Sequence, residues 1–335
     1  MDKIVIAVDT LGGDNGCKYM MLGIKEAMDN YDDINIIVTG NEAEINEYIE
    51  EYSCDKTRIE IIPSTEEITC HDAPVEAIRR KKNSSLVLAL NQIKEGKAQA
   101  CISSGNSGAI LAGGQFIVGR AKGVKRTPLA PLIPTSGRPS LLIDCGANVD
   151  AKPENLVQFA KMGSIYMENI EGVKNPTVGI INIGAEDEKG NALVKETIPL
   201  LRECKDINFI GSIESRELPF GAADVLVCEA FTGNALLKLY EGMASMFMRE
   251  VKAAIMTNTR SKLGGVMINK ALKNRLRKFK ADDKGGAPLL GLKGLVVKIH
   301  GNSKNSEVSS AIAQCRSFVK NNVTQKIVSA FEDGE

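Results

Sequence analysis

The stretch CISSGNSGAILAGGQFIVGR, residues 101–120, decides the fold. An apolar run ends there in a cluster of Ser, Gly and Asn, and an Ala/Gly/Ile/Leu-rich pattern typical of a helix begins at once. A strand that passes directly into a helix is typical of chains in which strands and helices alternate. The small residues at the junction resemble an anion cradle, although Gly and Ser also make ordinary turns.

The rest of the chain repeats this alternation. Strand-like runs occur at 4–9, 35–40, 58–63, 99–104, 140–146, 177–184, 207–212, 224–229 and 295–301. Helical patterns fall between most of them, for example at 18–30, 84–96, 153–170 and 190–204. Near-continuous Val/Ile runs indicate strands covered on both faces. The sequence therefore predicts one α/β domain over residues 1–335, with three α/β/α layers around a mostly parallel sheet.

The composition is that of a globular protein and limits the partners. Of the 335 residues, 43% are hydrophobic and 25% charged, and 42 Lys and Arg balance 42 Asp and Glu. Aromatic residues make up 4% and Trp is absent. A neutral chain with few aromatic side chains lacks both the charge and the stacking surfaces of nucleic-acid binders, so we expect no nucleic-acid partner.

Cysteine and histidine usage argues against a metal site and an exported protein. The 8 Cys form no C-x-x-C pair, and those at 101, 145 and 228 lie in apolar runs, where Cys acts as a small hydrophobic residue. Only 2 His are present. The opening run is too short for a signal peptide, and no run is long enough to span a membrane. We expect a cytoplasmic protein.

Small, amide and acidic residues cluster after six of the strands. The clusters lie at 9–16, 103–109, 144–150, 182–191, 229–235 and 300–305. Because ligands of parallel sheets bind beyond the carboxyl ends of the strands, six such clusters at one edge predict a binding site.

The clusters favour a small anion over a nucleotide. A dinucleotide fingerprint after the first strand is missing, Asp14 would repel a pyrophosphate there, and no Walker loop occurs. The SGNSGA junction has no acid, and its amides open a helix. Asn106 and Ser107 add side-chain donors, so phosphate or a carboxylate would suit this junction.

These residues resemble the PlsX family, the acyl-carrier-protein:phosphate acyltransferases. The motifs that carry the resemblance span the chain: DTLGGD, DAPVEAIRRKKNSSL (72–86), SSGNSGA, FIVGR (116–120), DCGANVDAKPENLVQFAKMGS (144–164), NIGAEDEKGN, FTGNALLK (231–238), GGAPLLGLKG (285–294) and KIHGNS. Two departures are mild: NGC follows DTLGGD where the family usually has Pro, and Ser107 stands where Thr is usual.

The resemblance implies a fold, an activity and partners. The fold would be like that of isocitrate and isopropylmalate dehydrogenases, without their cofactor, and the protein would be a homodimer. The reaction would move a fatty acyl group from acyl-ACP (acyl carrier protein) to inorganic phosphate, giving acyl phosphate and free ACP for phosphatidic acid synthesis. No cofactor or metal would take part. The acyl phosphate would pass to a membrane glycerol-phosphate acyltransferase.

Such a reaction needs phosphate held in line with the carbonyl, because phosphate is already an anionic nucleophile. We assign the phosphate cradle to Ser104, Gly105, Asn106, Ser107 and Gly108. His300 is the candidate for polarising the carbonyl or protonating the departing sulfur, and an ordinary structural role stays open for it. Asn182 and Lys195 are further catalytic candidates. The remaining candidates bind substrate or orient donors: Asp9, Gly12, Gly13, Asp144, Asn148, Glu186, Asp187, Thr232 and Asn234.

Residues 238–281 do not fit the sheet and predict a basic, amphipathic helical hairpin. Between 251 and 280 there are nine Lys and Arg and no Asp or Glu. Apolar residues recur at helical spacing at 243, 246, 247, 251 and 255, and at 268, 272, 276 and 279. Three roles are open: packing in a dimer, docking of ACP, and attachment to an anionic membrane surface that would make the protein peripherally membrane-associated.

Two other functions are open from the residues alone. A decarboxylating dehydrogenase of the same general fold would need the missing dinucleotide fingerprint. A non-catalytic adaptor for membrane or carrier protein would have no need for six polar strand ends.

Overall fold

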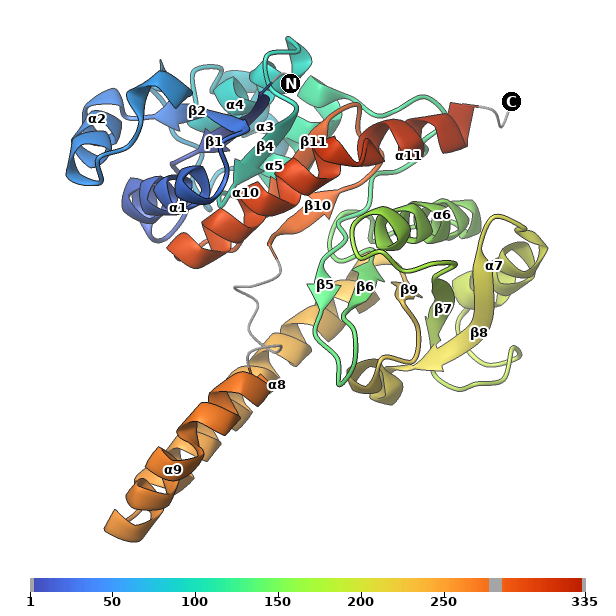
Figure 1. Cartoon of the computed structure of the whole chain (residues 1–335). Helices are drawn as coiled ribbons and strands as arrows, with labels where there is room; N and C mark the ends of the chain where they lie inside the picture. Colours follow the sequence, from blue (N-terminus) through green and yellow to red (C-terminus); the bar gives the residue numbers. More distant parts are fainter. Residues whose placement is uncertain (1–2, 277–284, 333–335) are drawn as a thin grey trace.

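The computed structural model describes residues 3–276 and 285–332 and arranges the strands in two sheets (Figure 1). All nine strands expected from the sequence are present. They are divided between two sheets, however, where the sequence had suggested one. The α/β class, with mostly parallel strands, is confirmed.

The first sheet has six strands in the order β10-β11-β4-β1-β2-β3, and only β10 is antiparallel to its neighbour. Its strands are β1 (Ile4–Asp9), β2 (Ile34–Gly40), β3 (Ile59–Pro63), β4 (Ala100–Ser103), β10 (Ala287–Leu289) and β11 (Leu295–Lys298). The chain returns to this sheet after building the second one (Figure 1).

Helices cover both faces of the first sheet, as the apolar strands require. Ile6 and Val8 pack among residues of α1 (Gly16–Asn30) and α10 (Asn305–Lys320). Ala7, which points the other way, packs among residues from the remaining helices of this sheet. Those helices are α3 (Pro74–Arg80), α4 (Ser85–Lys94) and α5 (Ser107–Gly113), which runs on into the π-helical turn η2 (Gly114–Val118). On the face of α1 and α10, α2 (Glu42–Glu51) packs beside α1, and η1 (Lys56–Arg58) leads into β3.

The second sheet has five strands in the order β5-β6-β9-β7-β8, with β5 antiparallel to β6. They are β5 (Leu132–Ile133), β6 (Ser140–Ile143), β7 (Thr177–Asn182), β8 (Asn208–Glu214) and β9 (Val225–Val227). One face packs on α6 (Pro153–Asn169) and α7 (Ala192–Glu203). The other packs on η3 (Ser215–Phe220) and the start of α8.

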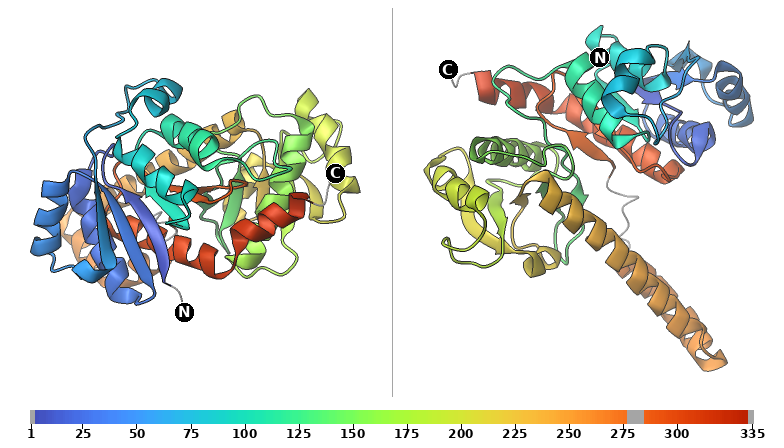
Figure 2. Two further views of the ribbon diagram at one scale, coloured as in Figure 1. Left: turned by 90° about the horizontal axis from the view of Figure 1, so that it is seen from above. Right: turned by 180° about the vertical axis from the view of Figure 1, so that it is seen from behind.

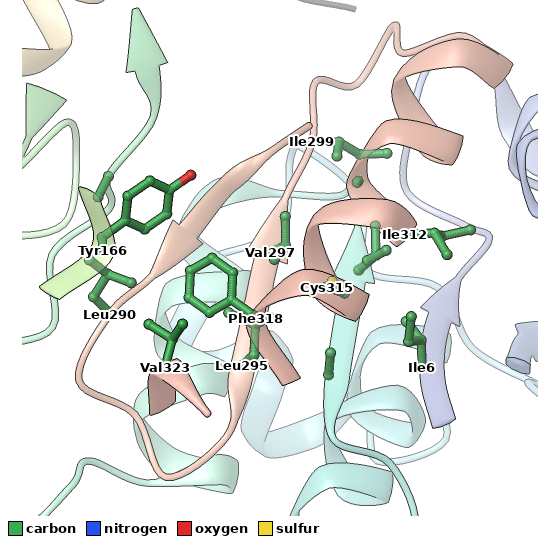
Figure 3. Close-up of a cluster of buried hydrophobic side chains, with 14 of the residues drawn as sticks. Ile6, Tyr166, Leu290, Leu295, Val297, Ile299, Ile312, Cys315, Phe318 and Val323 are labelled. Carbon is green, nitrogen blue, oxygen red and sulfur yellow. The ribbon is translucent and has the colours of Figure 1, made fainter. Parts of the chain in front are cut away.

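A single apolar cluster joins the two sheets. Tyr166 of α6 and Phe318 of α10 are fully buried, with their ring centroids 5.4 Å apart (Figure 3). Val323 of α11 (Val323–Glu332) lies beside them. The helices α10 and α11 thereby bury apolar surface against α6 of the second sheet as well as against the first sheet. That residues 1–335 form a single domain stays a prediction.

The predicted hairpin is confirmed and projects away from both sheets (Figures 1 and 2). It consists of α8 (Ala230–Met256) and α9 (Thr259–Leu276). The helices approach closely at Gly265, where a Cβ would lie 2.4 Å from Cγ2 of Ile255. Arg277, Lys278, Phe279 and Lys280, which the sequence had placed in the hairpin, lie outside the described residues. None of the helices within 3–276 and 285–332 has the length and apolarity needed to cross a bilayer.

Two glycines of α8 give opposite expectations for replacement by Ala. A Cβ at Gly233 would lie 1.9 Å from the carbonyl oxygen of Asp144, whereas one at Gly242 would meet nothing within 4 Å. We expect Gly233→Ala to lower the free energy of unfolding by 2 kcal/mol or more, on the order of other overpacking substitutions. Gly242→Ala should raise it by about 0.5–1 kcal/mol through helix propensity. Urea unfolding of both variants measures this, and a neutral Gly233→Ala would contradict the packing of α8 against β6.

Candidate functional site

Three loops meet at the carboxyl edge of the first sheet, as the sequence predicted for their strands. A Cβ on Gly12 would lie 3.2 Å from Cα of Gly105, and one on Gly13 would lie 2.3 Å from Oγ of Ser104. The amide of Asp14 donates to the carbonyl of Gly301 over 2.7 Å. The loops after β1, β4 and β11 therefore pack so closely around Gly12 and Gly13 that a larger residue at either position would clash.

Asp9 ties β1 to β4 from inside the sheet. Its side chain is 1% exposed and accepts hydrogen bonds from Ser103 Oγ (2.6 Å) and the amide of Leu11 (3.1 Å). Burial raises the pKa of Asp9 to about 6, against the lowering effect of these hydrogen bonds. The carboxyl group thus holds the loop in place and is not presented to a ligand.

Asn106 forms the N-cap of α5 and is engaged at both ends of its amide. Its Oδ1 accepts from the amide of Ala109 (3.1 Å), and its Nδ2 donates to the carbonyls of Thr69 (3.1 Å) and Asp72 (3.4 Å). The side chain predicted as a phosphate donor therefore shapes the loop instead. The amides of Ser107 and Gly108 have no partner among the described residues, so the loop retains its backbone donors.

A cavity of about 430 Å³ opens between this edge and the second sheet. Its apolar wall comes from β5, the turns around it and α8: Leu129, Pro131, Leu132, Ile133, Pro134, Leu237 and Ala244. Polar groups from α8, the loop after β4, the end of β11 and the segment after it line the rest: Ser107, Asn234, Lys238, Tyr240, Glu241, Lys298, His300, Ser303 and Glu307. The site therefore combines an apolar surface with a polar end, as sites for small ligands commonly do.

His300 links the first sheet to the hairpin. Its Nε2 lies 3.0 Å from Oε1 of Glu241 on α8, and both side chains line the cavity. The hydrogen bond to Glu241 raises the pKa of His300, against the opposing effect of its burial. The imidazole is thereby biased towards its protonated form, which can donate a proton.

The second sheet contributes fewer of its predicted residues to the cavity. Asn234 lines it. Asp144 is fully buried and accepts from the amides of Leu129 (2.9 Å) and Asn148 (2.8 Å) and from Nδ2 of Asn148 (2.7 Å). Burial raises the pKa of Asp144. Thr232 is held by Glu229, the N-cap of α8. These groups shape the turn behind the cavity.

Of the predicted residues, Ser107, Asn234 and His300 line the cavity. Four that do not line it lie at the end of β7, in the loop after it and on α7. Asn182 donates to Ser212 Oγ (3.1 Å), Glu186 pairs with Lys189 (2.9 Å) and Asp187 with Arg202 (2.6 Å). Lys195 is exposed on α7. The strands β7 and β8 lie on the side of the second sheet away from β5 (Figure 1), so their ends are displaced sideways from the part of that sheet that lines the cavity. One mostly parallel sheet would have aligned all six clusters; two sheets do not.

The polar cavity residues that were not predicted from the sequence include Glu241, Lys298 and Ser303. The KIHGNS motif contains two of them, but only His300 was taken from it. Lys298 is a charged residue inside the apolar run LVVKI, which is the signal that could have identified it. Glu241 gave no such signal, because the hairpin helix was analysed as a separate unit.

Comparison with solved structures places the fold among the phosphotransacylases. A phosphotransacetylase from Streptococcus pyogenes superposes with a TM-score of 0.63 at 14% identity, over 94% of this chain and 93% of that one. The EutD phosphotransacetylase from Staphylococcus aureus gives a TM-score of 0.59 at 17% identity, over 94% of both chains. At such identities the likeness concerns the fold alone.

Sequence comparison gives the family. Residues 4–326 match the model of the fatty acid synthesis protein family. The phosphate acyltransferase of Clostridium novyi is 46% identical over 327 residues, 98% of each chain, and that of Clostridium acetobutylicum 44% over 330 residues, 98% of this chain and 99% of the other. The chain therefore belongs to this family of phosphate acyltransferases, the PlsX family, as its motifs had indicated. It is an enzyme of the transferase class.

The buried Asp9 predicts a pH-dependent difference in stability. Because burial raises its folded-state pKa from 3.8 to about 6, the native protein binds the proton more tightly than the unfolded chain does. Stability is therefore lost as pH rises from about 4 to 6, by roughly 3 kcal/mol. Asp9→Asn should remove this loss. The free energy of unfolding of the variant minus that of wild type should therefore increase between pH 4.5 and 7.5. Urea unfolding measures the difference; the exposed Asp32→Asn serves as control, and an equal, pH-independent difference in both variants would refute the assignment.

Proposed function

We propose that this enzyme transfers a fatty acyl group from the thioester of acyl-ACP to inorganic phosphate, giving acyl phosphate and free ACP. The observation that carries the proposal is the cavity, where an apolar wall meets His300 and Ser107 of the loop after β4. An acyl chain needs an apolar wall, and phosphate and a departing thiolate need polar groups such as Ser107 and His300. The family of the chain supports the same reaction class.

In the proposed step a phosphate oxygen attacks the thioester carbonyl. The new C–O bond forms as the C–S bond breaks, and the sulfur leaves as a thiolate. Ser107 and the amides at the start of α5 hold the phosphate, and protonated His300, oriented by Glu241 at 3.0 Å, gives its proton to the sulfur. Positioning and charge stabilisation account for the rate, because phosphate needs no activating base at neutral pH.

The cysteines favour direct attack over an acyl-enzyme. Cys145 lines the cavity, and burial raises the pKa of its thiol well above the ordinary value. The same holds for Cys101 and Cys228, which are buried as the sequence predicted. A neutral buried thiol is a poor nucleophile, so these residues serve as small hydrophobic side chains.

Purified enzyme given acyl-ACP should release free ACP thiol only when phosphate is present, without added metal or nucleotide. Cys145→Ala should keep kcat/KM within about an order of magnitude of wild type, roughly 1.4 kcal/mol of barrier. Thiol release is followed with a chromogenic disulfide. Release without phosphate, a need for NAD, or complete loss in folded Cys145→Ala would each contradict the proposal.

The hairpin supports peripheral attachment of a cytoplasmic enzyme to anionic membranes. Val266 is 75% and Met267 85% exposed on α9, and Lys270, Lys273 and Arg275 follow them on the same helix. Apolar side chains that insert and cations that face lipid phosphates are what such binding needs. Delivery at the membrane would suit an acyl phosphate, which is hydrophobic and hydrolysable, and which we propose a glycerol-phosphate acyltransferase consumes on the route to phosphatidic acid.

The further partner that we propose is a second copy of this chain, with which it forms a homodimer. Exposed apolar side chains also run along α8, at Leu239 (62%), Phe247 (58%) and Met256 (55%). A second copy that pairs with this part of the hairpin would cover them and leave the basic residues of α9 for lipid or for the acidic carrier protein.

Charge reversal tests the membrane contact. Wild type should sediment with vesicles containing phosphatidylglycerol at low salt, and binding should weaken as salt screens the charges. The Lys270→Glu/Lys273→Glu/Arg275→Glu variant should lose most binding, since each basic residue is worth about 1 kcal/mol near an anionic surface. The matched control reverses three exposed lysines outside the hairpin, Lys94, Lys174 and Lys205. Equal vesicle binding by both triple variants would contradict the membrane contact and would mean that the basic residues of α9 face ACP or solvent.

A further inference from the structure

Lys298 is a partly buried cation in the cavity wall that sequence analysis did not assign. It ends β11, in register with Ser103 of β4, and its Nζ donates to the carbonyl of Ile299 over 3.2 Å. No carboxylate of the described residues lies within ion-pair distance of this Nζ. Burial lowers the pKa of Lys298, which shows that its charge is poorly solvated. Two donor protons of the ammonium group stay available to a ligand.

Ser303 provides a second, independent sign of a ligand in the same cavity. Its side chain is 4% exposed, and its Oγ has no hydrogen-bond partner among the described residues. Its amide donates to the carbonyl of His300 (3.1 Å), which fixes the residue in the turn after β11. A buried hydroxyl without a partner costs free energy unless something in the cavity bonds to it.

The charges of the cavity specify what that ligand is. Glu241 and Glu307 line the same cavity, so an anion there needs a positive charge against it. Glu241 is already bound to His300. Two lysines line the cavity, the exposed Lys238 of α8 and the partly buried Lys298. Lys298 can offset the charge of an anion inside the cavity, and the hydroxyl of Ser303 and the loop at Ser107 add neutral donors around it.

We propose that the ammonium of Lys298 and the hydroxyl of Ser303 bind the inorganic phosphate that accepts the acyl group, in the cavity that Ser107 also lines. This deepens the proposed function and rests on it. Lys298 also faces the charge that builds up on the phosphoryl and carbonyl oxygens as the bond forms, so it stabilises the transition state as well as the bound phosphate.

Phosphate binding to the protein alone tests the site without using activity. Titration calorimetry with inorganic phosphate should show a Kd at least tenfold higher in Lys298→Met, equivalent to about 1.4 kcal/mol, with partial recovery in Lys298→Arg. Ser303→Ala should raise the Kd about three- to tenfold. In steady-state assays the KM for phosphate should rise in parallel, while the KM for the acyl donor stays within about twofold of wild type.

Two matched variants control for nonspecific effects. Lys293→Met removes an exposed lysine from the turn before β11, and Ser164→Ala removes another buried hydroxyl without a partner, on α6 and outside the cavity. Both should bind phosphate as wild type does. A wild-type Kd in folded Lys298→Met, or a rise in the acyl-donor KM instead, overturns the proposal. If Lys298→Met does not fold, Ser303→Ala decides: a Kd within twofold of that of Ser164→Ala overturns it. Phosphate binding by a wild type that transfers no acyl group would refute the proposed reaction and leave the phosphate site standing.

Discussion

The site depends on one row of residues that crosses three adjacent strands. Parallel pairing places Asp9 of β1 opposite Ser103 of β4, and Ser103 opposite Lys298 of β11. Residues opposite one another in a parallel sheet point to the same face, so a carboxyl, a hydroxyl and an ammonium group follow in sequence across the sheet. Ser103 donates its hydroxyl hydrogen bond to Asp9, so neither side chain pairs with Lys298. The ammonium of Lys298 is thereby left to the cavity. The three loops that follow these strands converge because the strands end in this row.

The second sheet completes what the first sheet begins. Its strand β5 and the turn at Cys145 supply apolar wall and backbone, and α8 brings Glu241 to His300. The helix starts tightly against the end of β6, with Gly233 beside the carbonyl of Asp144, so its direction is fixed by backbone packing. The cavity therefore exists only where both sheets and the hairpin base meet, and Tyr166 and Phe318 hold the two sheets together on their buried side.

The sequence was sufficient for the elements and insufficient for their assembly. Long Val/Ile runs and helical periodicity gave nine strands, four of the helices and the hairpin, whereas β5 and β10 are too short to show a period. Strand ends also indicated the loops at Gly13, Ser104 and His300, which meet in the structure. Asn182 and Lys195 lie away from these loops, because no local pattern distinguishes one sheet from two. Asn106 is an N-cap in the structure, and an N-cap has the same sequence signature as a ligand donor. Glu241 needed the tertiary contact itself.

The unbroken helix α8 fixes the distance between the cavity and the far end of the hairpin. One unbroken helix carries Glu241 at the cavity and Met256 at the far end of the hairpin. Fifteen residues of straight helix span about 22 Å, and a helix paired with a second one along its length does not bend easily. Any surface that the far end touches is therefore held about that distance from Glu241 and the cavity. A carrier protein that delivers its acyl group would have to enter this gap from the side, and the arm that tethers the acyl group would have to reach across it.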